Sequence, residues 1–284
     1  MSKVAIDHYA VIGNPIAHSK SPLIHSMFAQ QTNDAMSYNT VLSPLDEFAA
    51  TVAEFQKQGG KGLNVTVPFK EQAWELADEL SDYAQAAGAV NTFVFKEDGS
   101  IYGANTDGIG LIRDLAINYH IDLKGKRVLL LGAGGAAKGV VQPLLEQNIK
   151  CLIIANRTEK RATTLATDFT EVATSLGCEI QGGSYNDLRK QGQFDLIINA
   201  TAASLQGIMP PMPESCLYQQ SVCYDMMYGN RPTAFECWCE DNGAALVVNG
   251  LGMLIEQAAE SYSLWRARQP DTKLVLDSFL AGIS

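Results

Sequence analysis

Short, uninterrupted runs of apolar residues divide the second half of the chain and predict buried β-strands. These runs are residues 128–131, 151–155, 194–199, 222–226 and 245–248. Strands of this kind are typical of a parallel sheet covered by helices on both faces. We therefore expect a doubly wound α/β domain in this half of the chain.

The first half of the chain shows shorter and more alternating patterns. Strands are predicted at residues 9–13, 38–42 and 63–67, and an amphipathic helix at 45–55. Residues 89–95 and 101–104 flank an Asp98-Gly99 turn and predict a β-hairpin. This region is expected to form a separate α/β domain.

The order of these elements suggests a domain division. We expect an N-terminal α/β domain over residues 1–105 and a Rossmann-type domain over 106–248, with a helix at 109–118 as the bridge between them. Helices at 254–268 and 274–280 follow after the second sheet is complete. The segment 249–284 is therefore expected to pack back on the N-terminal domain.

A glycine-rich turn directly follows the strand at 128–131 and precedes a helix. Gly132, Gly134 and Gly135 allow a sharp turn and a close approach of a pyrophosphate, and the helix start offers free N–H groups. The third glycine of the common G-x-G-x-x-G pattern is replaced by Ala137. Strand, turn and helix in this order favour dinucleotide binding over an ordinary βα turn.

The end of the next strand indicates which dinucleotide binds. NAD-binding folds usually place a carboxylate there, which bonds to the ribose 2′-hydroxyl. This chain has Asn156 and Arg157, with Lys160 and Arg161 close behind. A guanidinium can bind a 2′-phosphate through paired hydrogen bonds, whereas a solvated basic helix start is the alternative. We favour NADP.

Two serines precede the first predicted helix. Ser21 stands before Pro22 and is a candidate N-cap, and Ser19 lies two residues earlier. Their hydroxyls could equally bind a carboxylate at the helix start. The pattern leaves capping and anion binding open.

Polar residues at the end of the strand at 63–67 are candidate substrate ligands. Asn64 and Thr66 share one face by the period of two, although an exposed sheet face explains them as well. Lys70 follows in the first turn of a helix, where the dipole opposes an ammonium and favours the neutral amine, so this residue could donate or accept a proton. A solvated surface lysine is the alternative, and the helix-start position alone slightly favours it. Asp107 is either the N-cap of a later helix or a partner for Lys70.

Composition excludes several functions. The chain has 284 residues, 46% hydrophobic and 18% charged, with a net charge of −10, which argues against nucleic acid and anionic membranes as partners. Six cysteines without a C-x-x-C pair or a histidine partner set predict reduced core thiols and no metal. No signal peptide or membrane-length apolar run is evident, so we expect a cytoplasmic protein.

Several motifs together resemble shikimate dehydrogenase over nearly the whole chain. They are HSKSP (18–22), NVTVPFK (64–70), GAVNT (88–92), NTDG (105–108), GAGGAA (132–137), NRT (156–158), NAT (199–201) and YDMMY (224–228). The resemblance implies reversible, NADP-dependent reduction of 3-dehydroshikimate to shikimate in aromatic amino-acid biosynthesis. It also implies two α/β domains with the active site in the cleft between them.

The resemblance assigns roles to individual residues. Lys70 and Asp107 would be the catalytic pair. Ser19 and Ser21 would bind the substrate carboxylate, with Tyr228 near it, and the ring hydroxyls would contact Asn64, Thr66, Asn91, Asp107 and Gln257. The cofactor-binding residues would be Gly132, Ala133, Gly134, Gly135 and Ala136 for the pyrophosphate, Asn156, Arg157, Thr158 and Arg161 for the 2′-phosphate, and Ala200, Met226 and Gly250 on the nicotinamide side.

Ala202 stands where the commoner family pattern has serine, so one minor cofactor hydrogen bond would be missing. A quinate dehydrogenase that uses NAD is the alternative enzyme, and Arg157 together with Asn156 speaks against it. A catalytically silent NADP-binding sensor is the alternative outside enzymes, and the combination of Lys70 and Asp107 speaks against that. The expected partners are a small-molecule substrate and, at most, a second copy of the chain.

Overall fold

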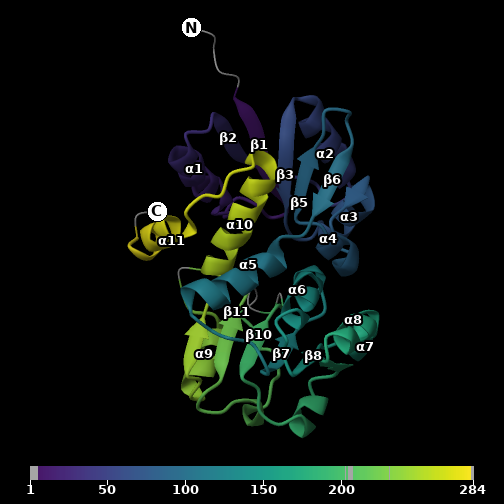
Figure 1. Cartoon of the computed structure of the whole chain (residues 1–284), viewed down its shortest axis with the longest axis vertical. Coiled ribbons are helices and arrows are strands. Elements are labelled where there is room, and N and C mark those ends of the chain that lie inside the picture. The colour runs from purple at the N-terminus through teal and green to yellow at the C-terminus, as the bar shows by residue number, and fades with distance from the viewer. Residues whose placement is uncertain (1–5, 202, 204–206, 230, 283–284) are drawn as a thin grey trace. The chain divides into compact units, whose positions relative to one another are not determined.

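The computed structural model describes residues 6–201, 203, 207–229 and 231–282. The chain forms two compact units, one of residues 1–113 with 254–284 and the other of residues 114–253. Each contains its own six-stranded sheet (Figure 1). Ala202 lies outside the described residues.

The first unit is a mixed sheet in the order β2-β1-β3-β5-β6-β4. β1 pairs in parallel with β2 and β3, whereas β3–β5 and β5–β6 are antiparallel. The predicted hairpin is therefore confirmed as β5 and β6. Its strands are β1 (Asp7–Gly13), β2 (Met36–Leu42), β3 (Gly60–Val65), β4 (Glu79–Leu80), β5 (Thr92–Phe95) and β6 (Ile101–Ala104).

Helices in the first unit bury their apolar sides against this sheet. One core cluster combines Phe48 and Val52 with Leu63, Phe69 and Phe93. The helices are α1 (Ser21–Thr32), α2 (Phe48–Lys57), α3 (Lys70–Leu76), α4 (Asp82–Ala87), α5 (Asp107–Arg113), α10 (Leu251–Arg266) and α11 (Thr272–Leu280).

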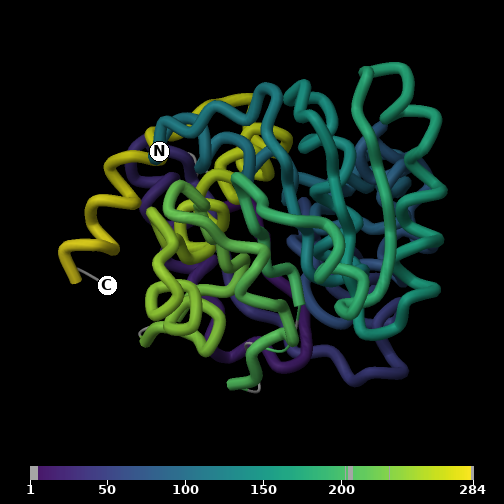
Figure 2. The backbone as a smooth tube through the Cα atoms, turned by 90° about the horizontal axis from the view of Figure 1, so that it is seen from below, coloured from purple at the N-terminus to yellow at the C-terminus, as the bar shows by residue number. Residues whose placement is uncertain are grey.

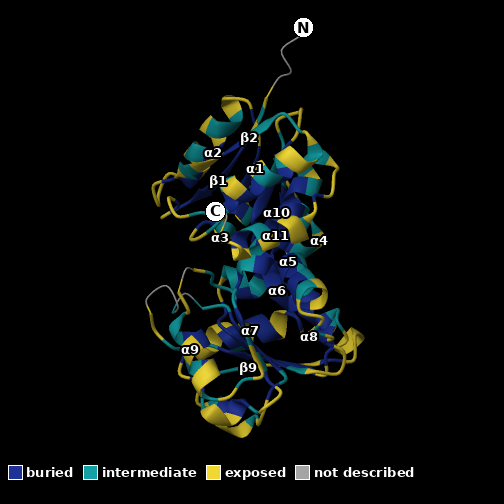
Figure 3. Cartoon of the chain, turned by 90° about the vertical axis from the view of Figure 1, so that its left-hand side faces the viewer, coloured by how far each residue is buried: buried dark blue, intermediate teal, exposed yellow. Residues whose placement is uncertain are grey.

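The C-terminal helices return to the first unit, as predicted. The Trp265 ring N–H donates to the Phe93 carbonyl at 2.9 Å, and Arg266 pairs with Asp7 and Asp34. α1 and α11 lie side by side although they are far apart in the sequence (Figures 1 and 2). Most of α10 is buried, as Figure 3 shows in dark blue. α10 thereby becomes part of the core next to β3 and β5.

The second unit is an all-parallel sheet in the order β12-β11-β10-β7-β8-β9. The strand order reverses between β7 and β10, and the carboxyl ends at such a point form the ligand-binding edge of open α/β sheets. The strands are β7 (Arg127–Leu131), β8 (Cys151–Ala155), β9 (Glu179–Gly183), β10 (Leu196–Asn199), β11 (Val222–Asp225) and β12 (Leu246–Val248).

Helices and short helical turns connect these strands. They are the π-helical turn η1 (Asp114–Asn118), α6 (Gly135–Leu145), α7 (Glu159–Asp168), α8 (Thr170–Ser175), the 3₁₀ turns η2 (Asp187–Lys190) and η4 (Glu214–Cys216), and α9 (Ala234–Asp241). The doubly wound α/β fold is as predicted.

Several local predictions were wrong. α1 begins at Ser21, so this residue is not the N-cap; Lys20 precedes the helix without a side-chain cap. Of the two alternatives for Asp107, the helix cap is wrong and the pairing with Lys70 is confirmed, because Asp107 is the first residue of α5 and its carboxylate accepts from Lys70 Nζ. The Asp107 N–H is itself accepted by Asn105 Oδ1 at 3.1 Å. The helix predicted at 109–118 is α5 followed by η1. β3 ends at Val65, so Thr66 lies just beyond the strand.

Among the described residues, no helix has both the length and the apolar character needed to cross a membrane. The same residues contain no group of three or more His, Cys, Asp or Glu that could hold a metal ion. All six cysteines are free thiols, and Cys237 alone among them is exposed.

Candidate active site

Lys70 and Asp107 form an ion pair in the first unit. Each is the first residue of a helix, Lys70 of α3 and Asp107 of α5, and Lys70 Nζ donates to Asp107 Oδ2. Their side chains are 15% and 8% exposed. A helix start stabilises a carboxylate and destabilises an ammonium, so Asp107 offsets the unfavourable position of Lys70. The pair places a proton donor where only a small part of it reaches solvent.

Asn91, directly before β5, orients this pair. Its Nδ2 donates to Asp107 Oδ1 at 2.8 Å, and its Oδ1 accepts the Thr106 N–H at 2.9 Å. The neighbouring Val90 N–H donates to the Lys70 carbonyl at 2.9 Å. The segment before β5 therefore fixes both the backbone of Lys70 and the carboxylate of Asp107.

Asn91 belongs to a larger set of buried hydrogen-bonding side chains, which we call the buried polar network. Its members are Asn64, Asn91, Thr92, Thr106, Gln257 and Ser261. Asn91 Nδ2 approaches Gln257 Oε1 at 3.2 Å, and Thr106 Oγ1 donates to the Gln257 carbonyl at 3.1 Å. α10 thus contributes side chains to a site otherwise formed by β3, β5 and the segment before α5.

Asn64 is held at both ends of its amide within this network. Tyr38 donates to Asn64 Oδ1 at 2.7 Å, and Asn64 Nδ2 donates to Ser261 Oγ at 2.9 Å. Ser261 also contacts Thr92 Oγ1 at 2.8 Å. Buried polar groups that are fully paired have one defined orientation. The orientation of Asn64 is therefore fixed before any ligand binds.

Sequence reasoning missed four of these residues: Tyr38, Thr92, Thr106 and Ser261. Thr92 and Thr106 stand inside motifs that had been singled out for their neighbours. Ser261 lies four residues after Gln257 in α10, and this spacing puts both on one helix face. That spacing was the available signal.

The remaining substrate-side candidates of the first unit are Ser19, Ser21 and Thr66. Ser21 is buried, and Ser19 Oγ accepts the Ser21 N–H at 3.3 Å. Thr66 is half-buried, and its N–H donates to the Ile12 carbonyl at 3.0 Å. In the part of the chain that the structure describes, no hydrogen bond joins these three hydroxyls to the buried polar network.

The glycine-rich turn of the second unit has the geometry of an anion cradle. Gly132 has φ +112°, and a Cβ added there would lie 3.1 Å from the Ala200 carbonyl oxygen, so the ends of β7 and β10 touch at the point where strand order reverses. Gly134 is the N-cap of α6 without a side-chain cap, and a Cβ there would meet open space. Free N–H groups with room above them fit a pyrophosphate. Ala133, Gly135 and Ala136 complete this turn.

The end of β8 leads into a basic segment, residues 156–161. The Asn156 N–H donates to the Gly183 carbonyl at 3.1 Å, and its side chain donates to the Thr158 carbonyl at 2.9 Å. Arg157, Lys160 and Arg161 are exposed at the start of α7. No described carboxylate forms an ion pair with Arg157 or Arg161. Their charges are available to an anionic group.

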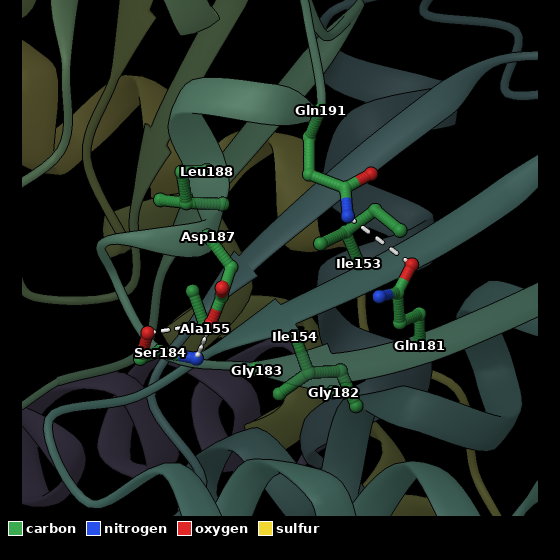
Figure 4. A pocket seen from close by; sticks show the side chains of 10 residues that line it. All are labelled: Ile153, Ile154, Ala155, Gln181, Gly182, Gly183, Ser184, Asp187, Leu188 and Gln191. Atoms are coloured by element: carbon green, nitrogen blue, oxygen red, sulfur yellow. Dashed lines mark hydrogen bonds between the residues drawn. The ribbon is translucent and has the colours of Figure 1, made fainter.

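A small pocket lies beside this strand end (Figure 4). It is lined by residues of β8, β9 and η2, among them Ala155, Gly183 and Asp187. Asp187 Oδ2 accepts hydrogen bonds from the Ser184 N–H and hydroxyl, and these bonds lower the Asp187 pKa. These two hydrogen bonds therefore hold Ser184 and Asp187 together in the pocket wall beside the basic segment.

The proposed nicotinamide-side residues lie at the ends of β10, β11 and β12. Ala200 abuts Gly132, as described above. A Cβ on Gly250 would lie 2.3 Å from the Met226 carbonyl oxygen, and the Gly250 N–H donates to the Met227 carbonyl at 2.8 Å. Tyr228 is half-buried just beyond. Met226 and Gly250 are therefore packed backbone to backbone.

Comparison with known proteins identifies the family. A model of the shikimate dehydrogenase substrate binding domain matches residues 11–93, a shikimate / quinate 5-dehydrogenase model matches 114–227, and a shikimate 5′-dehydrogenase C-terminal domain model matches 250–278. The shikimate dehydrogenase (NADP(+)) of Nitrosospira multiformis is 53% identical over 270 residues, 95% of this chain and 96% of that protein. The corresponding protein of Hahella chejuensis is 50% identical over 98% of this chain and all of its own length.

Solved structures of similar proteins have the same fold over nearly the whole chain. An Ael1 enzyme from Pseudomonas putida superposes with a TM-score of 0.86 at 44% identity, covering 96% of this chain and 97% of that one. A shikimate 5-dehydrogenase from Thermus thermophilus in complex with NADP(H) and shikimate gives a TM-score of 0.81 at 30% identity, covering 94% and 96%.

Fold and site together define an NADP-dependent oxidoreductase built from two α/β units. The chain belongs to the shikimate dehydrogenase family. Its reaction is the reversible reduction of 3-dehydroshikimate to shikimate, as predicted, and its cofactor is NADP. The reaction belongs to aromatic amino-acid biosynthesis.

Proposed function

We propose that Lys70 is the general acid and base of this reaction and that Asp107 is its partner. Reduction of the substrate ketone places negative charge on its oxygen, and the Lys70 ammonium donates a proton there. In the reverse direction the amine accepts the proton from the substrate hydroxyl. Asp107 holds the ammonium in position and Asn91 holds Asp107. The hydrogen-bonded ion pair is the observation that carries this assignment.

We propose that the first unit binds the substrate. Asn64, Asn91, Asp107 and Gln257 offer donors and acceptors for ring hydroxyls, and their pre-set orientation supports this role. Thr66 follows Asn64 and adds a hydroxyl. Ser19 and Ser21, at the start of α1, are assigned to the substrate carboxylate, together with Tyr228 from the second unit.

We propose that the second unit binds NADP. When bound, the cofactor supplies or accepts the hydride at its nicotinamide ring. The turn from Gly132 to Ala136 receives the pyrophosphate at the start of α6. Asn156, Arg157, Thr158 and Arg161 receive the 2′-phosphate. The guanidinium groups of Arg157 and Arg161 are exposed, and neither is paired with a carboxylate of the described residues. Ala200, Met226 and Gly250 form the nicotinamide side.

The test is the absorbance of reduced nicotinamide when the protein is mixed with shikimate and NADP⁺. We expect turnover with a higher kcat/KM than for quinate with NAD⁺. A higher kcat/KM for quinate with NAD⁺ would reassign the enzyme to the alternative substrate and cofactor. Absence of turnover with either pair would favour a cofactor-binding protein without activity.

We further propose that the protein is cytoplasmic and acts as a monomer or homodimer. Its six free cysteines fit a reducing compartment. The net charge of −10 opposes binding to nucleic acid or to an anionic membrane. Sedimentation of the purified protein measures its oligomeric state directly.

A further inference from the structure

Asp114 is a buried carboxylic acid that the proposed reaction does not use. It is the first residue of η1, and its residue surface is 0% exposed. Burying a carboxylic acid without partners is costly, so a buried Asp is normally held by several hydrogen bonds. π-Helical turns are rare and are often found at functional sites.

Two side-chain donors converge on the Asp114 carboxyl group. The Tyr224 hydroxyl donates to Oδ2 at 2.5 Å and Asn118 Nδ2 donates to Oδ1 at 2.8 Å. The backbone of Met253 lies near the same group and opposes the rise of its pKa. Burial raises the pKa of Asp114, and burial together with the Asp114 charge raises the pKa of Tyr224. Asp114 thus joins β11 to the first turn of α10.

Gly252 packs directly against this carboxyl group. A Cβ at Gly252 would lie 2.0 Å from Asp114 Oδ1, closer than any side chain can approach. The first turn of α10 can approach Asp114 this closely only because residue 252 has no side chain. Any side chain at position 252 would displace the Asp114 carboxyl group or the first turn of α10.

Both segments that Asp114 holds lead to the nicotinamide side. Tyr224 precedes Met226 by two residues along the end of β11, and Gly252 follows Gly250 by two residues. Met226 and Gly250 pack backbone to backbone, with Gly250 bonded to Met227. The carboxyl group of Asp114 therefore contacts both chain segments that lead to this pair, at Tyr224 and at Gly252.

We propose that Asp114 is a positioning residue that fixes the wall formed by Met226 and Gly250 against the nicotinamide of NADP. The inference rests on the proposed assignment of these two residues to the cofactor. Asp114 does not touch the cofactor and acts through Tyr224 and the turn from Gly250 to Gly252. Its loss should weaken binding of the nicotinamide half of the cofactor and leave the adenosine half unaffected.

The experiment measures the Kd of NADP⁺ and of 2′,5′-ADP, which lacks the nicotinamide half, for full-length Asp114→Asn and Tyr224→Phe. In Asp114→Asn the new amide N–H₂ faces one of the two side-chain donors, and in Tyr224→Phe one of these donors is lost. For each variant we expect NADP⁺ to bind about five- to ten-fold more weakly, while 2′,5′-ADP binds unchanged. The KM for shikimate at saturating NADP⁺ should also stay unchanged.

Asp195→Asn and Tyr218→Phe are matched controls. The Tyr218 hydroxyl donates to Asp195 Oδ1 at 2.6 Å, so the same chemistry occurs before β10, at the opposite end of the sheet. These variants should leave both Kd values unchanged. An unchanged NADP⁺ Kd in Asp114→Asn and Tyr224→Phe, or equal losses for both ligands, overturns the inference. If Asp114→Asn does not fold, Tyr224→Phe decides alone.

Gly250→Ala separates this inference from the site assignment on which it rests. Its added methyl group collides with the Met226 backbone and must displace the wall. If Gly250→Ala leaves NADP⁺ binding unchanged, the assignment of the wall to the nicotinamide is wrong. If it weakens NADP⁺ selectively while the Asp114 and Tyr224 variants do not, only the role of Asp114 is refuted.

Discussion

Lys70 and Asp107 are the first residues of two different helices, and their side chains form an ion pair. The helix dipoles act on them in opposite directions, since each helix start favours the carboxylate and disfavours the ammonium. The structure therefore keeps a lysine in a position that is unfavourable without its partner. This placement supports the proposed role of Lys70 in proton transfer.

Asp107→Asn should lower kcat because it removes the charge that holds Lys70. A hydrogen bond to a charged group is worth about 1.5–3 kcal/mol, so we expect a loss of about 10- to 100-fold. Steady-state kinetics with saturating shikimate and NADP⁺ measure it. Glu79→Gln, which breaks the exposed Lys96–Glu79 pair in the same unit, is the control and should leave kcat unchanged. Equal rates for Asp107→Asn and the parent enzyme would remove Asp107 from the mechanism.

Arg157→Ala should weaken NADP⁺ far more than NAD⁺. The guanidinium is assigned to the 2′-phosphate, which NAD⁺ lacks, and loss of one charge-assisted contact corresponds to about 10- to 100-fold in Kd. Titration of both cofactors by fluorescence provides the comparison. Arg189→Ala, at another exposed arginine of the second unit, is expected to change neither Kd. Similar losses for the two cofactors in Arg157→Ala would contradict the phosphate assignment.

Ser261→Ala should raise the KM for shikimate and lower stability. Its hydroxyl contacts the Asn64 amide and the Thr92 hydroxyl inside the buried polar network, so its removal takes one hydrogen-bond partner from each, at a cost of about 0.5–1.5 kcal/mol per bond. Urea denaturation and steady-state kinetics measure the two effects. Ser263→Ala is the control two residues further along α10, where the hydroxyl bonds to the Ala259 and Arg268 carbonyls and to the Gln269 side chain, none of which belongs to the buried polar network. An unchanged KM in Ser261→Ala would mean that the network does not orient Asn64.

His25 should make the protein less stable in acid. Burial lowers its pKa from 6.5 to about 3, and its ring stacks on Tyr38 with the centroids 4.1 Å apart. Because the folded-state pKa is the lower one, the unfolded chain takes up the proton first as the pH falls. The contribution is complete above pH 6.5 and is lost toward pH 3, by about 1.4 kcal/mol per pH unit.

The free energy of unfolding in urea between pH 7.5 and 5 tests this contribution. The pH dependence should become shallower in His25→Phe, which keeps a stacked ring but cannot bind a proton. His120→Asn removes an exposed histidine at a residue with φ +55° and should leave the dependence as it is. An unchanged slope in His25→Phe would show that another group takes up the proton.

Much of the fold could be predicted because its strands are strongly apolar. The strand at 151–155 was predicted at its observed bounds, and the turn after β7 was recognised by its glycines. β9 was missed, since an edge strand of sequence EIQGG, none of it fully buried, has neither an apolar run nor a clear alternation. α10 begins at Leu251, three residues earlier than predicted, and the Asn249 side chain accepts the Leu251 N–H at 3.1 Å, a signal that the sequence prediction did not use.

The candidate site was predicted less completely than the fold. Lys70 and Asp107 were named as a pair through the motifs NVTVPFK and NTDG, whereas the helix-start position of Lys70 alone slightly favoured a surface role. The bond between Asn64 and Ser261 joins residues 197 positions apart, and no local pattern reports such a contact. The domain boundaries at 105 and 248 and the roles of the individual site residues stay predictions.

The most direct test of the account is a single-turnover measurement on Lys70→Ala. Nicotinamide absorbance is followed after NADPH and 3-dehydroshikimate, both saturating, are mixed with the variant and with the parent enzyme. A rate lower by about 10²- to 10⁴-fold, with the Kd values of both ligands little changed, is the result we predict. A rate equal to that of the parent enzyme would show that the proton comes from another group.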